Sequence, residues 1–341
     1  MRLRPNWEET KLKFAVEFVP QEAYWKTTYY AMLAEKSGYD YVWITDHFNN
    51  RNVYTALTNI LNYTDRVKIG PGVTNPYVLH PIGLAQSMMS LAEMGPGRVI
   101  CGLGTGDKTT LDMVSIPRNK PLRTVRETTQ IVREITAGNR LTMEGKIYQI
   151  SGVKLNFKIP DPVPVFIGAQ GPKMLALAAE IGDGVLINAS SPKDFEPAFT
   201  HIKEGLAKAE KKMGDIEVVA ATAFSVDKDL EKARQAAMPV AAFIVAGCPE
   251  PILERHGISV EAAGEISAAI AKGDWGAVFG KVTPEMLDAF AICGTPETCI
   301  EKINNLKKMG VTLFITGSPI GPKIHKSIEL FSKEVLPHVS D

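Results

Sequence analysis

The chain alternates strand-like and helix-like segments from end to end, and this alternation constrains the fold more than any other feature. Segments with helical periodicity follow most of the strand-like runs. The runs are rich in Val, Ile, Leu and Phe, as in strands covered on both faces: 13–18, 39–46, 66–73, 98–106, 163–169, 184–190, 216–226 and 311–318. Eight strand–helix units in 341 residues favour a closed (β/α)8 barrel of the TIM type over an open doubly wound sheet.

Two stretches depart from this alternation. Residues 141–150 read as a hairpin excursion around Glu144 and Gly145. Residues 245–295 read as a helical insertion before the eighth strand. No linker is long enough to separate domains, so we expect residues 1–341 to form one α/β barrel domain with insertions.

Charge and cysteine content narrow the class of function. Lys plus Arg and Asp plus Glu both number 38, so the formal net charge is zero and the sequence lacks the basic field of a nucleic-acid-binding protein. No run of 18 apolar residues predicts a membrane span, and the N-terminus lacks the apolar core of a secretory signal. The four cysteines form no CxxC pair and the histidines show no metal-binding spacing. We therefore expect a cytoplasmic enzyme without a metal site.

Barrel enzymes carry their active sites at the C-terminal ends of the strands, and this rule selects residues by position. The selected residues are Glu17 for the first strand, Asp46 and His47 for the second, Gly72, Val73, Thr74 and Asn75 for the third, Thr105 and Asp107 for the fourth, Gly168, Ala169, Gln170 and Gly171 for the fifth, Asn188, Ala189 and Ser190 for the sixth, and Gly317 and Ser318 for the eighth.

Three of these residues are carboxylates expected at the same mouth. Glu17 stands within the apolar run AVEFV, where an acidic side chain requires a reason. The functional interpretation is a proton donor or an orienting group whose pKa is raised by burial and like charge. The structural alternative is that Glu17 caps a backbone group or pairs with a lysine. For Asp46 and His47, a simple turn at the strand end competes equally with a functional role.

Two loops suit a ligand with a flat ring and an anionic group. GLGTGDK is glycine-rich, which allows close approach of a ring, but it lacks the full dinucleotide-binding spacing. FIGAQGPKM places Pro172 in the first turn of a helix, beside Lys173. Free N–H groups and the helix dipole make such a turn an anion site; a plain strand–helix turn is the alternative.

Several uninterrupted motifs carry a resemblance to a known family. They are EFVP (17–20), ITDHFNN (44–50), IGPGVTNPY (69–77), GTGDK (104–108), GAQGP (168–172), LINASSPKDFE (186–196), FIVAGCPEPILERHGI (243–258) and GSPIGP (317–322). Through them the sequence resembles the coenzyme F420-dependent methylenetetrahydromethanopterin reductases of the bacterial-luciferase-like superfamily, from about residue 12 onward. Residues 1–11 then form an extension to which we assign no role.

The resemblance implies a reaction and its partners. It implies reversible hydride transfer between reduced coenzyme F420 and 5,10-methylenetetrahydromethanopterin, or the related sarcinapterin, in methanogenesis or its reversal. It also implies that F420 is a dissociable cosubstrate, that no flavin or metal is used, and that the enzyme is a cytoplasmic homodimer or homotetramer.

The resemblance also implies roles for particular residues. The Gly72–Val73 peptide bond is expected to be cis, forming a bulge under the deazaflavin ring, with Asn75 nearby. Glu17 is the first choice as acid and Asp107 the second, with Asp46 as the third catalytic candidate. The expected cofactor contacts are Asp46, His47, Gly72, Val73, Asn75, Thr105, Asp107, Gly168, Ala169, Gln170, Gly171, Asn188, Ala189 and Ser190, of which Gly168 to Gly171 would hold the phosphate-bearing side chain.

Three alternatives stay open at this point: an FMN-dependent monooxygenase of the same superfamily, another F420-dependent dehydrogenase, and a non-catalytic barrel. More distant dehydrogenase relatives tend to have Glu where this chain has Asp107, and a Trp after their His where this chain has Phe48, Asn49 and Asn50. These differences favour the pterin reductase branch.

Overall fold

The computed structural model describes residues 11–339, so most of the expected N-terminal extension lies outside the described residues. The strands are β1 (Lys13–Phe18), β2 (Tyr41–Ile44), β3 (Lys68–Pro71), β4 (Cys101–Leu103), β5 (Leu141–Glu144), β6 (Gln149–Val153), β7 (Val165–Gly168), β8 (Gly184–Asn188), β9 (Glu217–Val226), β10 (Ala291–Gly294) and β11 (Leu313–Ile320).

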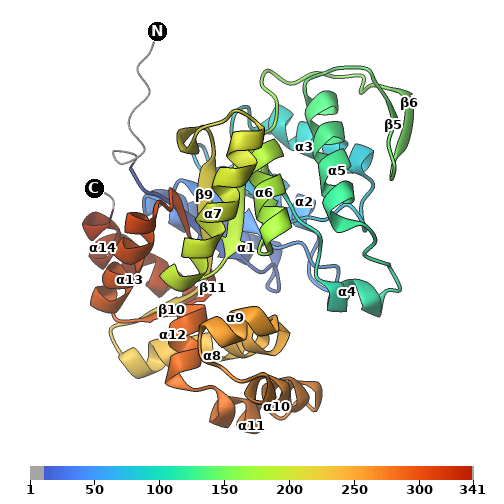
Figure 1. The fold of residues 1–341 in the computed structure, drawn as a ribbon. Helices are drawn as coiled ribbons and strands as arrows, with labels where there is room; N and C mark the ends of the chain where they lie inside the picture. The colour runs from blue at the N-terminus through green and yellow to red at the C-terminus, as the bar shows by residue number, and fades with distance from the viewer. Residues whose placement is uncertain (1–10, 340–341) are drawn as a thin grey trace. The chain divides into compact units, whose positions relative to one another are not determined.

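The helices mostly follow these strands one by one (Figure 1). They are α1 (Tyr24–Lys36), α2 (Val53–Tyr63), α3 (Pro81–Met94), α4 (Lys108–Met113), α5 (Pro121–Thr136), α6 (Pro172–Ile181), α7 (Pro192–Lys208), α8 (Leu230–Gly247), α9 (Glu250–Arg255), α10 (Val260–Ala271), α11 (Trp275–Lys281), α12 (Pro284–Phe290), α13 (Pro296–Met309) and α14 (Ile324–Glu334). No helix in residues 11–339 combines the length and apolar character needed to cross a bilayer.

The parallel sheet confirms the predicted barrel class. Its strand order is β3-β2-β1-β11-β9-β8-β7-β4. Isolated parallel bridges then join β3 to β4, at Ile69 with Val99 and at Thr74 with Leu103, so the two ends of the sheet meet. Alternating strands and helices of this kind bury both faces of every strand.

The chain divides into two compact units. The N-terminal unit comprises Ala15–Ile187 and His201–Val218. The C-terminal unit comprises Asn188–Thr200, Val219–Asp341 and the chain up to Phe14, as far as these residues are described. That the whole chain is one domain stays our proposal.

In the N-terminal unit, the predicted hairpin is confirmed as β5 and β6, which pair antiparallel beside α5 (Figure 1). Glu127 of α5 holds this hairpin, because its buried carboxylate accepts hydrogen bonds from the backbone N–H groups of Lys146, Ile147 and Tyr148 at 2.9–3.1 Å. Burial alone would raise the pKa of Glu127, but these three donors lower it.

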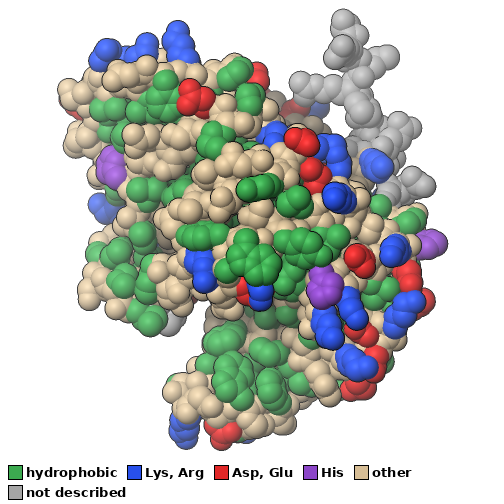
Figure 2. Space-filling view, turned by 180° about the vertical axis from the view of Figure 1, so that it is seen from behind, with side chains coloured by type: hydrophobic (Ala, Val, Ile, Leu, Met, Phe, Trp, Pro, Cys, Tyr) green, Lys and Arg blue, Asp and Glu red, His purple; other side chains and the backbone are tan. Residues whose placement is uncertain are grey.

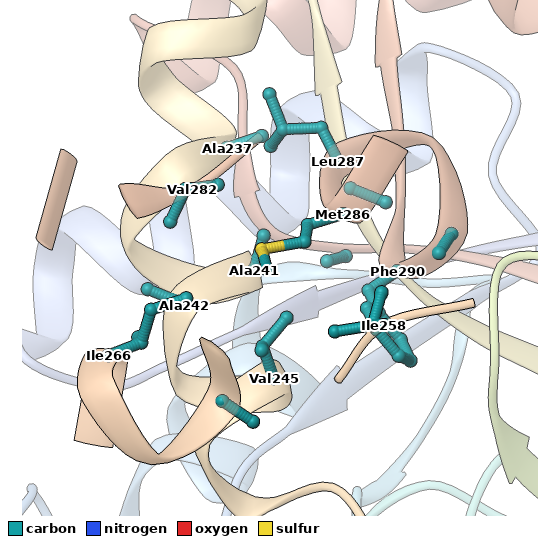
Figure 3. Packing of buried hydrophobic residues seen from close by; sticks show 14 of the residues in the cluster. Ala237, Ala241, Ala242, Val245, Ile258, Ile266, Val282, Met286, Leu287 and Phe290 are labelled. Atoms are coloured by element: carbon teal, nitrogen blue, oxygen red, sulfur yellow. The ribbon is translucent and has the colours of Figure 1, made fainter. Parts of the chain in front are cut away.

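In the C-terminal unit, the predicted insertion is mostly helical. Helices α10, α11 and α12 pack against α8, and Leu253 of α9 belongs to the same apolar cluster. Figure 3 shows Ala241, Ala242 and Val245 of α8 among the apolar side chains of the insertion, and all three are fully buried. Small residues along α8 let the neighbouring helices approach it closely.

One part of the insertion was predicted wrongly. Ala291–Gly294 was expected to be mostly helical, but it is strand β10, which pairs in parallel with β9. The run AICG is short and apolar, and four residues are too few for periodicity to separate a buried strand from a helix.

Candidate active site

The interior of the N-terminal unit is organised around Trp43 of β2. Strand register places Trp43 opposite Glu17 of β1 and Gly70 of β3. The indole is 1% exposed and lies 5.9 Å from the ring of Phe166. A Cβ atom at Gly70 or Gly102 would lie 3.1 or 2.9 Å from Trp43 Cζ3, so these glycines leave the room that the indole occupies.

Glu17 lies at the C-terminal end of β1 beside this tryptophan. Its Oε2 atom would be 3.4 Å from a Cβ placed on Gly72. Within residues 11–339, no hydrogen bond or ion pair involves its carboxyl, so neither a cap nor a lysine pair accounts for it. Burial raises the pKa of Glu17 from 4.5 to about 7. A carboxyl with such a pKa exchanges its proton near neutral pH, as an acid catalyst must.

The peptide bond between Gly72 and Val73 is cis, as predicted. It follows β3 directly, and the Val73 side chain then lies beside the ends of two other strands. A Cβ at Gly104 would approach Val73 Cγ2 at 2.6 Å, and one at Gly168 would approach it at 3.6 Å. The ends of β3, β4 and β7 therefore meet around one valine, with no side chain at either glycine.

Asp46 is held by a hydrogen-bonded chain that sequence reasoning did not find. The Thr74 hydroxyl donates to Asp46 Oδ2 at 2.7 Å, and Tyr54 Oη lies 3.2 Å from Thr74 Oγ1. Burial raises the pKa of Asp46, and the Thr74 hydrogen bond opposes that rise. His47 is exposed. Thr74 is one of the residues selected by position after the third strand, but no sequence pattern connects Tyr54 to it.

Asn75 and Asp107 both make local hydrogen bonds. Asn75 Oδ1 accepts from the N–H groups of Tyr77 and Val78, each at 3.1 Å, which shapes the turn after the cis bond. Asp107 is exposed and caps α4, accepting from the Thr110 N–H at 2.8 Å. This cap accounts for an acidic residue at position 107 without catalysis.

Thr105 lies two positions before Asp107 in the sequence and is half-buried. Gly106, which follows it, has φ of 68°, and a Cβ there would lie 3.2 Å from Asn75 Cγ. The turn after β4 thus requires a glycine in the left-handed region close to Asn75.

The loop after β7 has the form expected of an anion site. Ala169 is buried, and its N–H donates to the Leu186 carbonyl at 2.9 Å. Gln170 and Gly171 are exposed; Gly171 is the N-cap of α6 without a side-chain cap, and no atom lies within 4 Å of a Cβ placed on it. Pro172 begins the helix, as predicted.

Asn188, Ala189 and Ser190 belong to the C-terminal unit. Ser190 is buried, and its hydroxyl donates to the Phe290 carbonyl at 3.1 Å. Asn188 is exposed and Ala189 is half-buried. The structure therefore gives Ser190 a packing role, and a cofactor role for the three residues stays a prediction.

Metal chemistry has no visible site in the described chain. No group of three or more His, Cys, Asp or Glu side chains in residues 11–339 is arranged to hold an ion. Asp46 binds the Thr74 hydroxyl and Asp107 binds the Thr110 N–H. The Glu17 carboxyl has no hydrogen-bond or ion-pair partner in the described chain.

The chain is similar to known proteins over nearly its whole length. The family model for luciferase-like monooxygenases matches residues 13–313. A 5,10-methylenetetrahydromethanopterin reductase of Archaeoglobus fulgidus is 52% identical, over 96% of this chain and 99% of that protein. A protein of the same name from Methanolobus tindarius is 49% identical, over 95% of this chain and 100% of its own length.

A solved structure agrees with these relatives. The coenzyme F420-dependent tetrahydromethanopterin reductase of Methanopyrus kandleri superposes with a TM-score of 0.94 at 40% identity, over 96% of this chain and 99% of that one.

Proposed function

Because this chain belongs to the luciferase-like family, and within it to the 5,10-methylenetetrahydromethanopterin reductases, we propose that it catalyses reversible hydride transfer between reduced coenzyme F420 and 5,10-methylenetetrahydromethanopterin. The products are 5-methyltetrahydromethanopterin and oxidised F420. The observation that carries this function is the 52% identity to a reductase of that name over nearly the full length of both chains.

The residues present fit a flat cofactor ring. Gly104 and Gly168 lie beside the Val73 side chain and carry no side chain of their own, and Gly72, Val73 and Gly168 are each partly exposed. Bound F420 supplies the hydride, while the protein supplies alignment and electrostatics. We assign Gly72, Val73 and Asn75 to the ring, and Thr105 and Asp107 to its edge.

The open N-terminus of α6 fits the anionic side chain of the cofactor. The N-terminus of a helix attracts negative charge through its dipole, and Gly171 leaves room for an anionic group there. We assign Gly168 to Gly171 to this part of F420. Asn188, Ala189 and Ser190 complete the proposed cofactor-binding set.

Glu17 is the proposed proton donor. The pterin's methylene bridge opens when one ring nitrogen accepts a proton, and hydride then adds to the carbon that was bridged. The carboxyl of Glu17 is free of protein partners in the described chain, and burial sets its pKa at about 7, so a large fraction is protonated at neutral pH. Asp107 is the second candidate, and its capping of α4 makes it the weaker one.

An anaerobic assay tests the function directly. Purified protein is mixed with reduced F420 and methylenetetrahydromethanopterin, and the return of deazaflavin absorbance is followed, with methylene-sarcinapterin in a parallel reaction. Turnover with either pterin supports the proposal. Protein that binds F420 but turns over neither pterin would contradict it and favour a dehydrogenase of different substrate.

We also propose that the enzyme is a cytoplasmic homodimer or homotetramer. Large apolar side chains stay exposed on the first two helices, with Trp25 67%, Tyr29 48% and Tyr63 64% exposed. Figure 2 shows hydrophobic side chains gathered between charged ones on one face of the molecule. Light scattering should give a mass of two or four chains; a single-chain mass at assay concentration would contradict the assembly. The free cysteines suit a reducing compartment.

A further inference from the structure

Three side chains from separate segments form a hydrogen-bonded chain that ends on Asp46. Tyr54 lies in the first turn of α2, Thr74 follows β3, and Asp46 follows β2. Thr74 Oγ1 is 2.7 Å from Asp46 Oδ2, and Tyr54 Oη is 3.2 Å from Thr74 Oγ1. All three residues belong to the N-terminal unit.

The direction of these hydrogen bonds follows from the chemistry of the groups. A threonine hydroxyl has one proton, and Thr74 gives that proton to the carboxylate. Tyr54 must therefore donate its own proton to Thr74 Oγ1. The chain runs from the phenol through the hydroxyl to the carboxylate, and each bond polarises the next.

Thr74 is fixed firmly enough to determine the position of Asp46. Its side chain is 0% exposed. Its backbone N–H donates to the Gly102 carbonyl at 2.9 Å, and its carbonyl accepts from the Gly104 N–H at 2.8 Å. These two hydrogen bonds fix the Thr74 backbone against Gly102 and Gly104. The Thr74 hydroxyl donates to one oxygen of Asp46, Oδ2.

The other oxygen, Asp46 Oδ1, has no hydrogen-bond partner in the described part of the chain. Asp46 itself is half-buried, so part of the residue is exposed. An ionised carboxylate accepts hydrogen bonds only, so its ligand must offer a donor.

We propose that Thr74 and Tyr54 are positioning residues, which orient Asp46 so that its Oδ1 accepts a hydrogen bond from an N–H group of the bound cofactor ring. This inference rests on the proposed function, because it takes F420 as the ligand at this mouth. It adds to that function two hydroxyl groups that affect cofactor affinity through their hydrogen bonds to Asp46 and to each other. Burial favours the protonated form of Asp46, and Thr74 opposes that tendency by binding the ionised form.

The test compares F420 binding and steady-state kinetics among single variants. Thr74→Val removes the hydroxyl at nearly constant volume, Thr74→Ser restores it, and Tyr54→Phe removes the second donor. Thr129→Val is the matched control, because Thr129 is also buried in the N-terminal unit but its hydroxyl has no partner there.

We expect Thr74→Val to weaken F420 binding by roughly tenfold to a hundredfold, the range for a hydrogen bond to a charged group. Tyr54→Phe should weaken it by about threefold, since it acts through Thr74 on a neutral bond. The KM for the pterin should change by less than about twofold, because positioning of Asp46 acts on the cofactor alone. Thr74→Ser and Thr129→Val should bind F420 like the wild type.

A double variant separates positioning from folding. In an Asp46→Asn background, Thr74→Val should cost little further F420 affinity, because the group that it orients is already changed. Full additivity of the two losses would overturn the proposal. Wild-type F420 affinity in Thr74→Val would also overturn it, as would equal losses for F420 and pterin with no rescue by Thr74→Ser.

Failure of the proposed function gives a different result. If the wild type binds F420 but reduces no pterin, the function is wrong, while a loss of binding specific to Thr74→Val would still support the positioning role. If the wild type reduces the pterin and all the variants behave like it, the function stands and the positioning role is wrong.

Discussion

Replacing Glu17 by glutamine is expected to slow the reaction and to stabilise the folded state in neutral and alkaline solution. The substitution keeps the shape of the side chain and removes its exchangeable proton. A general acid typically contributes on the order of 10²–10⁴-fold, so kcat should fall by about that factor. In the wild type, kcat/KM should decline as pH rises through about 7, the pKa that burial gives Glu17, and this decline should be absent in Glu17→Gln.

The expected gain in stability follows from the same pKa. Folding raises the pKa of Glu17 from 4.5 to about 7, so the folded state binds the proton more tightly than the unfolded state. This contribution is fully present below pH 4.5 and is lost as pH rises through about 7. At about 1.36 kcal/mol for each pKa unit, the loss is about 3 kcal/mol by pH 8, and glutamine avoids it.

Urea unfolding at pH 5 and pH 8, beside kcat at both values, checks this reasoning. At pH 5 the variant should be more stable than the wild type by less than about 1 kcal/mol, and at pH 8 by about 3 kcal/mol. Gly264→Ala serves as a control: residue 264 lies in α10, with no atom within 4 Å of an added Cβ, so its effect should not depend on pH. Equal activity of Glu17→Gln and wild type, or a variant less stable at pH 8, would refute the assignment.

Three further predictions address the cofactor face, the hairpin and the insertion. Gly104→Ala should displace Val73, since its Cβ would lie 2.6 Å from Val73 Cγ2, and should raise the Kd for F420 by about tenfold; an unchanged Kd in fluorescence titration would contradict this. Glu127→Gln should destabilise the protein by about 2 kcal/mol at pH 7, and because its pKa is lowered the difference should shrink as pH falls below 4.5 in urea unfolding. Asp194→Asn should cost about 2 kcal/mol, because Asp194 is 3.0 Å from the buried His256 ring and also binds an arginine; a melting temperature equal to the wild type would contradict that.

Predictions from the sequence were correct where a single residue or a repeating hydrophobic pattern determines the local structure. The strand–helix alternation predicted the barrel, and the hairpin around Glu144 and Gly145 was confirmed. Pro172 marked the start of α6 because proline suits only the first turn of a helix. The cis bond between Gly72 and Val73 was predicted through the family resemblance.

Sequence reasoning failed where the outcome depends on packing between distant segments. Residues Ala291–Gly294 form strand β10 because they pair with β9, and the run AICG does not reveal this partner. The bond between Thr74 and Asp46 joins residues 28 positions apart, and a small polar side chain gives no signal of its partner. Asp107 shows a different difficulty. An aspartate after the fourth strand can be a helix cap or a catalytic acid, and the sequence does not distinguish the two roles.

The glycines of β3 and β4 bear on both the surroundings of Glu17 and the surface that we propose for F420. Gly70 and Gly102 make room for the Trp43 indole inside the barrel, where larger side chains would otherwise pack. The indole fills that space beside Glu17, whose pKa is raised by burial rather than by a neighbouring charge. Directly after β4, Gly104 leaves the space that the Val73 side chain occupies. Glycines at these positions thus leave room for the indole beside Glu17, our proposed proton donor, and for the valine of the surface proposed to receive F420.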